Sequence, residues 1–181
     1  MKTLIINGSP RKSGDTSSLV SVMKQALEGE VIELSPYHDN ISPCFDCRYC
    51  WKKGKCAIED DMELIYNDDY ENLVVASPVY ISHLTGPTIN LVSRLQVYYA
   101  AKKILKQEIV LREKKGILML VGGGDGAPNM AINYASGVFK RLNVSFDDMV
   151  LSLNTDRVPA IQDENAVQKV KQIAYKLNSG E

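Results

Sequence analysis

Short apolar runs alternate with amphipathic segments along this chain. The apolar runs predict buried strands at residues 3–6, 31–34, 73–76, 117–121 and 144–151. The segments between them predict helices at residues 16–27, from an Asp60 or Asp61 N-cap to about 67, from Gly86 onwards, at 128–142 and at 163–177.

Strands that alternate with helices in this way pair in parallel, since each helix returns the chain to the same edge of the sheet. We therefore expect one α/β domain over residues 1–181: a three-layer, doubly wound, five-stranded parallel sheet with helices on both faces. Ligands of such sheets bind beyond the carboxyl ends of the strands. Three loops follow strand ends, at residues 7–18, 77–86 and 122–126, and they are expected to form one site.

The first of these loops reads Asn-Gly-Ser-Pro-Arg-Lys-Ser-Gly-Asp-Thr-Ser-Ser. Backbone amides, hydroxyls and the dipole of the following helix all favour a phosphate there. The glycine spacing fits neither the dinucleotide fingerprint nor the nucleoside triphosphate loop, so one terminal phosphate is the better interpretation. The alternative is an ordinary helix start capped by serine or threonine.

The other two loops suit a flat ligand. Ser77-Pro78-Val79-Tyr80 turns the chain away from a buried strand, and Tyr80 offers a planar surface. Residues 122–126 contain four glycines, which let the backbone pass close to a ligand. Each loop alone is also typical of an ordinary turn. Together the three loops predict a planar cofactor that carries a phosphate.

All four cysteines lie in the one long irregular segment, residues 35–58, as Cys44, Cys47, Cys50 and Cys56. Structural zinc sites usually draw two pairs of ligands from separate turns. Three thiols within seven residues and a fourth close by instead resemble iron–sulfur ligation. Lysines 52, 53 and 55 would offset the negative charge of such a cluster. Zinc and four free thiols remain the alternatives.

Composition excludes several other classes of function. With 21 basic and 22 acidic residues the net charge is -1, which indicates neither a nucleic acid nor a membrane partner. No apolar run approaches the length of a membrane span, so a cytoplasmic protein with reduced thiols is expected. His38 and His83 are the only histidines, too few for a histidine-dependent hydrolytic centre. The segment after Arg94 is unusually apolar for a surface connection, which predicts that it lies either in the core or in a subunit interface.

Several motifs resemble the NADPH-dependent FMN reductase and iron–sulfur flavoprotein families. Residues 8–16 resemble their FMN phosphate loop. Residues 43–56 with Asp-Asp-Met at 60–62 resemble their cysteine segment, and Ser-Pro-Val-Tyr at 77–80 with Thr-Gly-Pro at 85–87 resembles their flavin-contacting loop. The motifs occur in family order. The resemblance implies a flavodoxin-like fold with strand order 2-1-3-4-5, FMN between strands 1 and 3, and a homodimer or homotetramer.

Carried over by position, the resemblance assigns the phosphate to Ser9, Arg11, Ser13, Thr16 and Ser17. It assigns the ribityl chain and ring to Pro78, Val79, Tyr80, Gly122, Gly123 and Gly124, and a [4Fe–4S] cluster to the four cysteines. This chain departs from the pattern at Asp15, where the family usually has Asn. Unless Asp15 turns away to cap its helix, its carboxylate would weaken phosphate binding. Ile89 and Ser93-Arg94 also replace a lysine and an Asp-Arg pair.

These observations favour an FMN-dependent oxidoreductase that passes electrons from NAD(P)H or ferredoxin to a quinone, flavin or other small acceptor. No acid–base residue of the protein is expected to be catalytic, because flavin chemistry needs mainly orientation and tuning. Backbone amides of residues 79–80 and 122–124 are expected to face the reduced ring. The alternative is an electron carrier in which cluster and FMN relay single electrons between protein partners. A receiver-type signalling domain is excluded because residues 6–8 supply no acidic side chain. A thiol-based sensor without flavin leaves the three strand-end loops unexplained.

Overall fold

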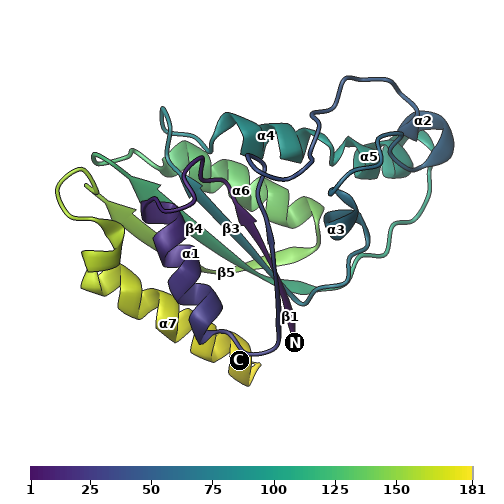
Figure 1. Cartoon of the computed structure of the whole chain (residues 1–181). Helices are drawn as coiled ribbons and strands as arrows, with labels where there is room; N and C mark the ends of the chain where they lie inside the picture. The colour runs from purple at the N-terminus through teal and green to yellow at the C-terminus, as the bar shows by residue number, and fades with distance from the viewer. Residues whose placement is uncertain (181) are drawn as a thin grey trace.

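A computed structural model describes residues 1–180 (Figure 1). Its sheet has the strand order β2-β1-β3-β4-β5, and every neighbouring pair is parallel. The predicted fold class and strand order are therefore confirmed. The strands are β1 (Lys2–Asn7), β2 (Glu30–Leu34), β3 (Asn72–Pro78), β4 (Lys114–Gly122) and β5 (Val144–Leu153), each at its predicted place.

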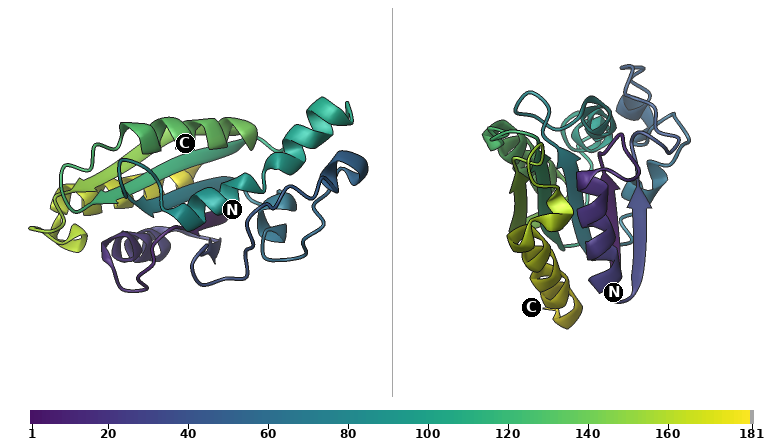
Figure 2. Two further views of the ribbon diagram at one scale, coloured as in Figure 1. Left: turned by 90° about the horizontal axis from the view of Figure 1, so that it is seen from above. Right: turned by 60° about the vertical axis from the view of Figure 1, so that its left-hand side comes forward.

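Helices cover both faces of the sheet. On one face, α1 (Asp15–Ala26) and α7 (Glu164–Ser179) lie side by side (Figures 1 and 2). The other face is covered by α3 (Glu63–Tyr66), α4 (Gly86–Ser93) and α6 (Asn129–Arg141). Successive side chains of a strand point to opposite faces, so Val74 packs in the first layer while Leu73 and Val75 pack in the second. This explains why the strands read as continuous apolar runs.

At the start of α7 the Asp163 side chain accepts a hydrogen bond from the Ala166 amide and so caps the helix. At α3 the predicted N-cap, Asp60 or Asp61, is wrong. The N-cap is Met62, and the Asp60 carboxylate, just before the helix, accepts both from the Met62 amide (3.2 Å) and from Arg94, 34 residues further along the chain. The spacing predicted an aspartate cap but did not reveal this long-range ion pair.

A small lobe projects from the end of the sheet (Figure 1). It contains α2 (Cys50–Lys53), α5 (Gln96–Tyr99) and the π-helical turn η1 (Ala100–Ile104), which contact one another. Val97, Ala100 and Ala101 are buried, whereas Tyr99 and Ile104 are exposed. The apolar segment after Arg94 is thus partly core and partly surface. Within residues 1–180, no helix combines the length and apolarity that crossing a bilayer requires.

Candidate functional site

The three strand-end loops meet at the carboxyl edge of the sheet. The Gly8 amide donates to the Ala76 carbonyl (2.7 Å), and the Thr85 hydroxyl donates to the Gly8 carbonyl (2.9 Å). The Val79 amide donates to the Val121 carbonyl (2.8 Å). The first loop is therefore bonded to the second, and the second to the strand that leads into the third. This is the arrangement that the positions of the loops predicted.

Two hydroxyls of the first loop are used internally. The Ser9 hydroxyl accepts from the Arg11 amide (3.2 Å) and donates to the Arg11 carbonyl (2.9 Å), and the Ser17 hydroxyl donates to that carbonyl as well (2.7 Å). Ser9, Ser17 and Thr16 are buried, whereas the side chains of Arg11 and Ser13 are exposed. The buried hydroxyls therefore shape the loop, which leaves the backbone amides and the exposed side chains to meet a phosphate.

Helix α1 begins without a side-chain cap. Its N-cap is Gly14, and no side chain accepts a hydrogen bond there. The alternative of an ordinary serine- or threonine-capped start is therefore not what the structure contains. The first amides of a helix need an acceptor, and the helix dipole favours a negatively charged one. An anion bound at Gly14 would supply it.

Gly8 brings the first loop against the start of α4. A Cβ atom at this position would lie 2.3 Å from the Thr88 hydroxyl and 3.2 Å from the Ala76 carbonyl. The Thr88 hydroxyl is itself hydrogen-bonded to that of Thr85 (2.8 Å). Only glycine fits between these groups.

Asp15 bonds to a distant segment of the chain. Its carboxylate accepts a hydrogen bond from the Ala160 amide (2.9 Å), at the start of the 3₁₀ turn η2 (Ala160–Gln162), and lies 3.6 Å from the Arg11 guanidinium. The carboxylate is thus engaged with η2 rather than capping its own helix. One carboxylate oxygen is bound by an amide 145 positions away and the other faces Arg11, so the effect of Asp15 on phosphate binding stays a prediction.

The second loop is a strained tight turn. The Tyr80 amide donates to the His83 carbonyl (2.9 Å), and the His83 amide donates to the Tyr80 carbonyl (3.0 Å). Between them Ile81 and Ser82 have φ values of 50° and 62°, and Ile81 is 97% exposed. Positive φ is unfavourable for a β-branched residue, and such strain is typical of functional loops. Half-exposed Tyr80 is available to a flat ligand, while the ring of His83 packs against that of Tyr134.

The amides of the second loop correct one expectation. Those of Val79 and Tyr80 already donate to the carbonyls of Val121 and His83, so in this structure they do not face a ligand ring. For the amides of residues 122–124 the expectation stays a prediction.

The third loop is held by a segment that sequence reasoning missed. Each of its first three glycines accepts a backbone hydrogen bond from this segment. The Gly122 carbonyl accepts from the Thr155 amide (3.0 Å), that of Gly123 from Asp156 (3.2 Å) and that of Gly124 from Asn154 (2.7 Å). A Cβ at Gly123 would also lie only 2.7 Å from both carboxylate oxygens of Asp156. The signal was available, because these residues follow the fifth strand and so reach the same edge of the sheet.

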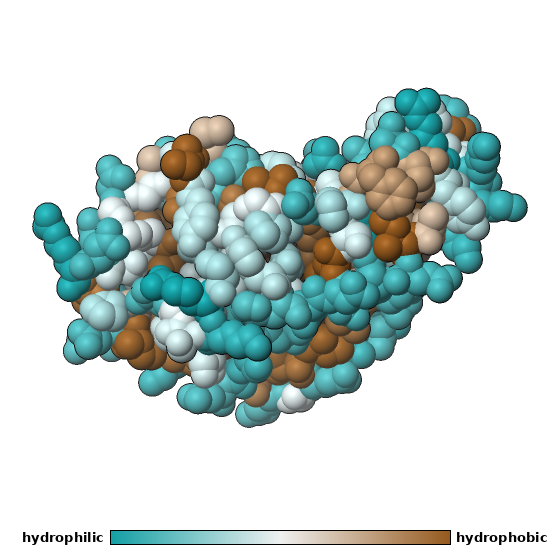
Figure 3. Space-filling view, turned by 45° about the horizontal axis from the view of Figure 1, so that its top comes forward, coloured by the Kyte–Doolittle hydropathy of each residue, from teal (hydrophilic) through white to brown (hydrophobic). Residues whose placement is uncertain are grey.

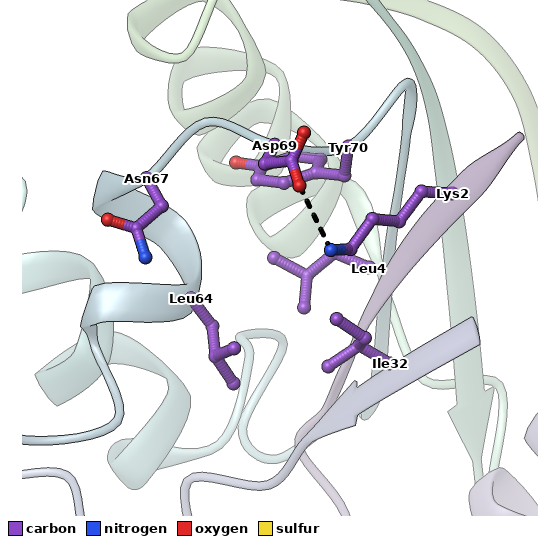
Figure 4. Close-up of a pocket in the computed structure, with 7 residues that line it drawn as sticks. All are labelled: Lys2, Leu4, Ile32, Leu64, Asn67, Asp69 and Tyr70. Atoms are coloured by element: carbon purple, nitrogen blue, oxygen red, sulfur yellow. Dashed lines mark hydrogen bonds and ion pairs between the residues drawn. The ribbon is translucent and has the colours of Figure 1, made fainter. Parts of the chain in front are cut away.

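A cavity of about 320 Å³ opens beside the first loop, on the β2 side. Burial raises the pKa of Glu33 in its wall, but hydrogen bonds from Asn7 and Lys24 outweigh this and hold that pKa below the usual value. A second cavity, of about 140 Å³, lies toward the opposite edge of the sheet, where Lys2 pairs with Asp69 (Figure 4). It is remote from the three loops. The first cavity is lined by Asn7, Ser9, Lys12, Ser17, Glu33, Ser35, His38 and Asp39.

The four cysteines lie apart from these loops, on the segment that contains α2. Cys44 and Cys47 are exposed, and Cys50 and Cys56 are partly buried. Burial raises the pKa of the Cys50 thiol, and the charges of the other three cysteines add to the effect. Within residues 1–180, no three His, Cys, Asp or Glu side chains converge as a metal-binding group. The donor set suits a cluster, but the thiols would have to move together to bind it, so cysteine ligation stays a prediction.

Sequence comparison adds to this geometry. Residues 1–145 match the model of the NADPH-dependent FMN reductase family. The chain belongs to this family. Its similar solved structures share the fold: an FMN-dependent NADH-azoreductase from Bacillus anthracis in complex with FMN superposes with a TM-score of 0.70 at 17% identity, covering 98% of this chain and 100% of that one. An NAD(P)H:quinone oxidoreductase from Methanothermobacter marburgensis also superposes with a TM-score of 0.70, at 10% identity. The alignment covers 98% of this chain and 96% of that one.

Curated relatives of this FMN reductase family member include iron–sulfur flavoproteins. One from Archaeoglobus fulgidus is 29% identical over 145 residues, which are 77% of this chain and 63% of that protein. One from Methanocaldococcus jannaschii is 30% identical over 129 residues, 67% and 62% of the two chains. The chain therefore spans less than two thirds of these relatives. A second Archaeoglobus fulgidus protein aligns at 29% identity over 99% of this chain and 90% of its own length.

Proposed function

We propose that this chain is an FMN-dependent oxidoreductase that takes electrons from NAD(P)H and passes them to a quinone, a flavin or another small acceptor. The observation that carries the proposal is the uncapped start of α1 at Gly14, within a loop bonded to the second strand-end loop. Membership of the FMN reductase family supports FMN as the group that meets this helix start.

The residues of the chain would divide the work of holding FMN. The first amides of α1, with Arg11 and Ser13 at the loop surface, would bind the phosphate. Tyr80 would lie against the ring, and the glycines of residues 122–124 would let the backbone approach it. Bound FMN supplies the electron transfer itself. The protein orients it and limits the access of water, so no side chain is required as an acid or a base.

The second candidate is an iron–sulfur flavoprotein that carries single electrons between partners such as ferredoxin. It is favoured by the four clustered thiols and by the iron–sulfur flavoproteins among the relatives. In both cases we propose a cytoplasmic homodimer or homotetramer with no nucleic acid partner.

One substitution tests the FMN site directly. Gly14→Asp would place a carboxylate where it caps α1 and repels a phosphate, so we expect FMN affinity to fall by at least about a hundredfold. Gly14→Ala is the matched control. Its Cβ lies 3.0 Å from the Arg11 side chain, as that of the aspartate would, but alanine has no oxygen to accept a hydrogen bond from the helix amides. We expect it to bind FMN within about tenfold of the native chain. Flavin fluorescence titration measures both, and equal affinity of Gly14→Asp and native protein would contradict the proposal.

Anaerobic purification separates the two candidates. Flavin absorbance bands with NAD(P)H oxidation and no iron would support the reductase. Stoichiometric iron and sulfide with negligible NAD(P)H oxidation would support the carrier. A colourless protein that takes up no FMN would rule out both.

A further inference from the structure

An ion pair buried outside the flavin loops has no role in the proposed function. Arg94 follows α4 directly, and its side chain is 1% exposed; that of its partner Asp60 is 2% exposed. The two guanidinium NH₂ groups donate to the two carboxylate oxygens at 2.7 and 3.1 Å. Burying such a pair costs solvation free energy that only good geometry and further hydrogen bonds offset. The further hydrogen-bond partners of Arg94 and Asp60 therefore show what the ion pair holds together.

Those partners are the two ends of the cysteine segment, residues 42–58. Arg94 donates to the carbonyl of Ser42 (2.8 Å) and to that of Ile58 (3.2 Å). Asp60 in turn accepts from the Ser42 amide (3.1 Å). One guanidinium thus joins the point where the segment leaves the body of the protein to the point where it returns. Next to it, the Ser93 hydroxyl accepts from the Cys44 amide (3.0 Å).

The opposite end of α4 contacts the first flavin loop. Thr85, its N-cap, donates to the Gly8 carbonyl, and Thr88 lies against Gly8. An eight-residue helix is about 12 Å long. A single short helix therefore has the phosphate loop at its start and the cysteine segment at its end (Figure 1).

Between these ends, part of the cysteine segment lies at the molecular surface. Asp46 and Arg48 have φ values of 52° and 58°, and the Phe45 side chain is exposed. Arg48 packs over the half-exposed ring of Trp51, 4.8 Å from its centre. Apolar side chains of this lobe lie at the molecular surface in Figure 3. The thiols between the clamped ends thus lie in the lobe, outside the sheet.

We propose that Arg94 is the positioning residue of the cysteine segment: with Asp60 it fixes both ends of residues 42–58 to the end of α4, at a set place relative to the first loop. The inference rests on the proposed function only in taking that loop as the FMN site. The Asp-Arg pair that the family pattern led us to expect is Ser93-Arg94 here, and both residues hold the segment.

The test is Arg94→Lys in the full chain, with reduced, metal-free thiols. Lysine keeps the charge but cannot reach the carboxylate and both carbonyls at once. We expect hydrogen exchange in residues 42–58, and the alkylation rates of Cys50 and Cys56, to rise by about tenfold or more, with β1, β3 and β4 unchanged. Arg112→Lys is the matched control, because Arg112 and its partner Asp69 are 58% and 60% exposed. It should change neither rate.

Two outcomes would overturn the proposal: unchanged protection of residues 42–58 in Arg94→Lys, or protection lost equally across the sheet. If Arg94→Lys does not fold, Asp60→Asn gives the same comparison with less change of shape. The native chain alone is also informative, since the Ser42 and Cys44 amides should exchange much more slowly than that of Asp46. Equal rates would refute the clamp. A native chain that fails to bind FMN would refute the proposed function and leave these exchange results valid.

Discussion

At the scale of single residues, two positions decide the shape of the phosphate loop. Gly8 is required because the Thr88 hydroxyl and the Ala76 carbonyl leave no room for a Cβ. Asp15 is held in place because its carboxylate accepts from the Ala160 amide and lies beside Arg11. Glycine content was visible in the sequence, whereas the direction of the Asp15 side chain was not.

Gly8→Ala should destabilise the protein by about 1–3 kcal/mol, since the added methyl group must displace Thr88 or the β3 backbone. It should also weaken FMN binding. Urea denaturation measures the free energy of unfolding. Gly137→Ala in the interior of α6 is the control, because only the flexible Arg141 side chain lies nearby. It should stabilise by about 0.5–1 kcal/mol, and equal effects of the two changes would contradict the packing argument.

Asp15→Ala should lower the free energy of unfolding by about 1 kcal/mol, because it leaves the Ala160 amide without its acceptor. Asp15→Asn keeps an oxygen at that place and should cost much less. Its lost contact with the exposed Arg11 is worth little. Denaturant titration of the two variants tests this, and an equal loss in both would show that charge rather than hydrogen bonding matters at Asp15.

At the scale of elements, α4 joins two parts of the molecule that the motifs treated separately. Its N-cap contacts the first loop, and the residues at its end hold the cysteine segment. Burial raises the pKa of Asp60, but the hydrogen bonds from Arg94 and the backbone outweigh this, so its pKa lies below the usual value. The ionised carboxylate is therefore the form that the fold stabilises.

This direction sets a pH dependence for the clamp. A carboxylate with a lowered folded pKa contributes stability above the unfolded value of about 3.9 and loses it as pH falls through the folded value. We therefore expect the contribution of Asp60 to the free energy of unfolding to be constant above about pH 5 and to decrease below about pH 4. The decrease should be smaller in Asp60→Asn, measured by thermal unfolding from pH 3 to 7. Parallel curves for the two proteins would contradict the assignment.

At the scale of the whole molecule, the projecting lobe exposes apolar side chains. Tyr99, Ile104 and Val110 belong to the apolar segment after Arg94, for which a place in the core and a subunit interface were both predicted as alternatives. The buried members of the segment anchor the lobe to the body. The exposed ones form the surface that we predict to mediate self-association.

Sedimentation should therefore show a dimer or tetramer, because these apolar side chains gain burial when two lobes meet. Tyr99→Glu with Ile104→Glu should shift the protein toward the monomer. Tyr175→Glu is the control, since this tyrosine is also exposed but lies on α7. A native monomer, or equal dissociation by the control, would contradict the predicted interface.

The sequence by itself determined the places of the strands, the parallel fold and the three loops that meet, because hydrophobic periodicity and turn residues are local signals. It also placed the four thiols on one segment. Only the tertiary structure decided which side chains pair across the chain. Asp15 bonds Ala160, Asp60 pairs with Arg94 instead of capping α3, and residues 154–156 hold the glycine loop. These partners depend on how helices pack onto the sheet, and a local pattern contains no information about contacts made dozens of residues away.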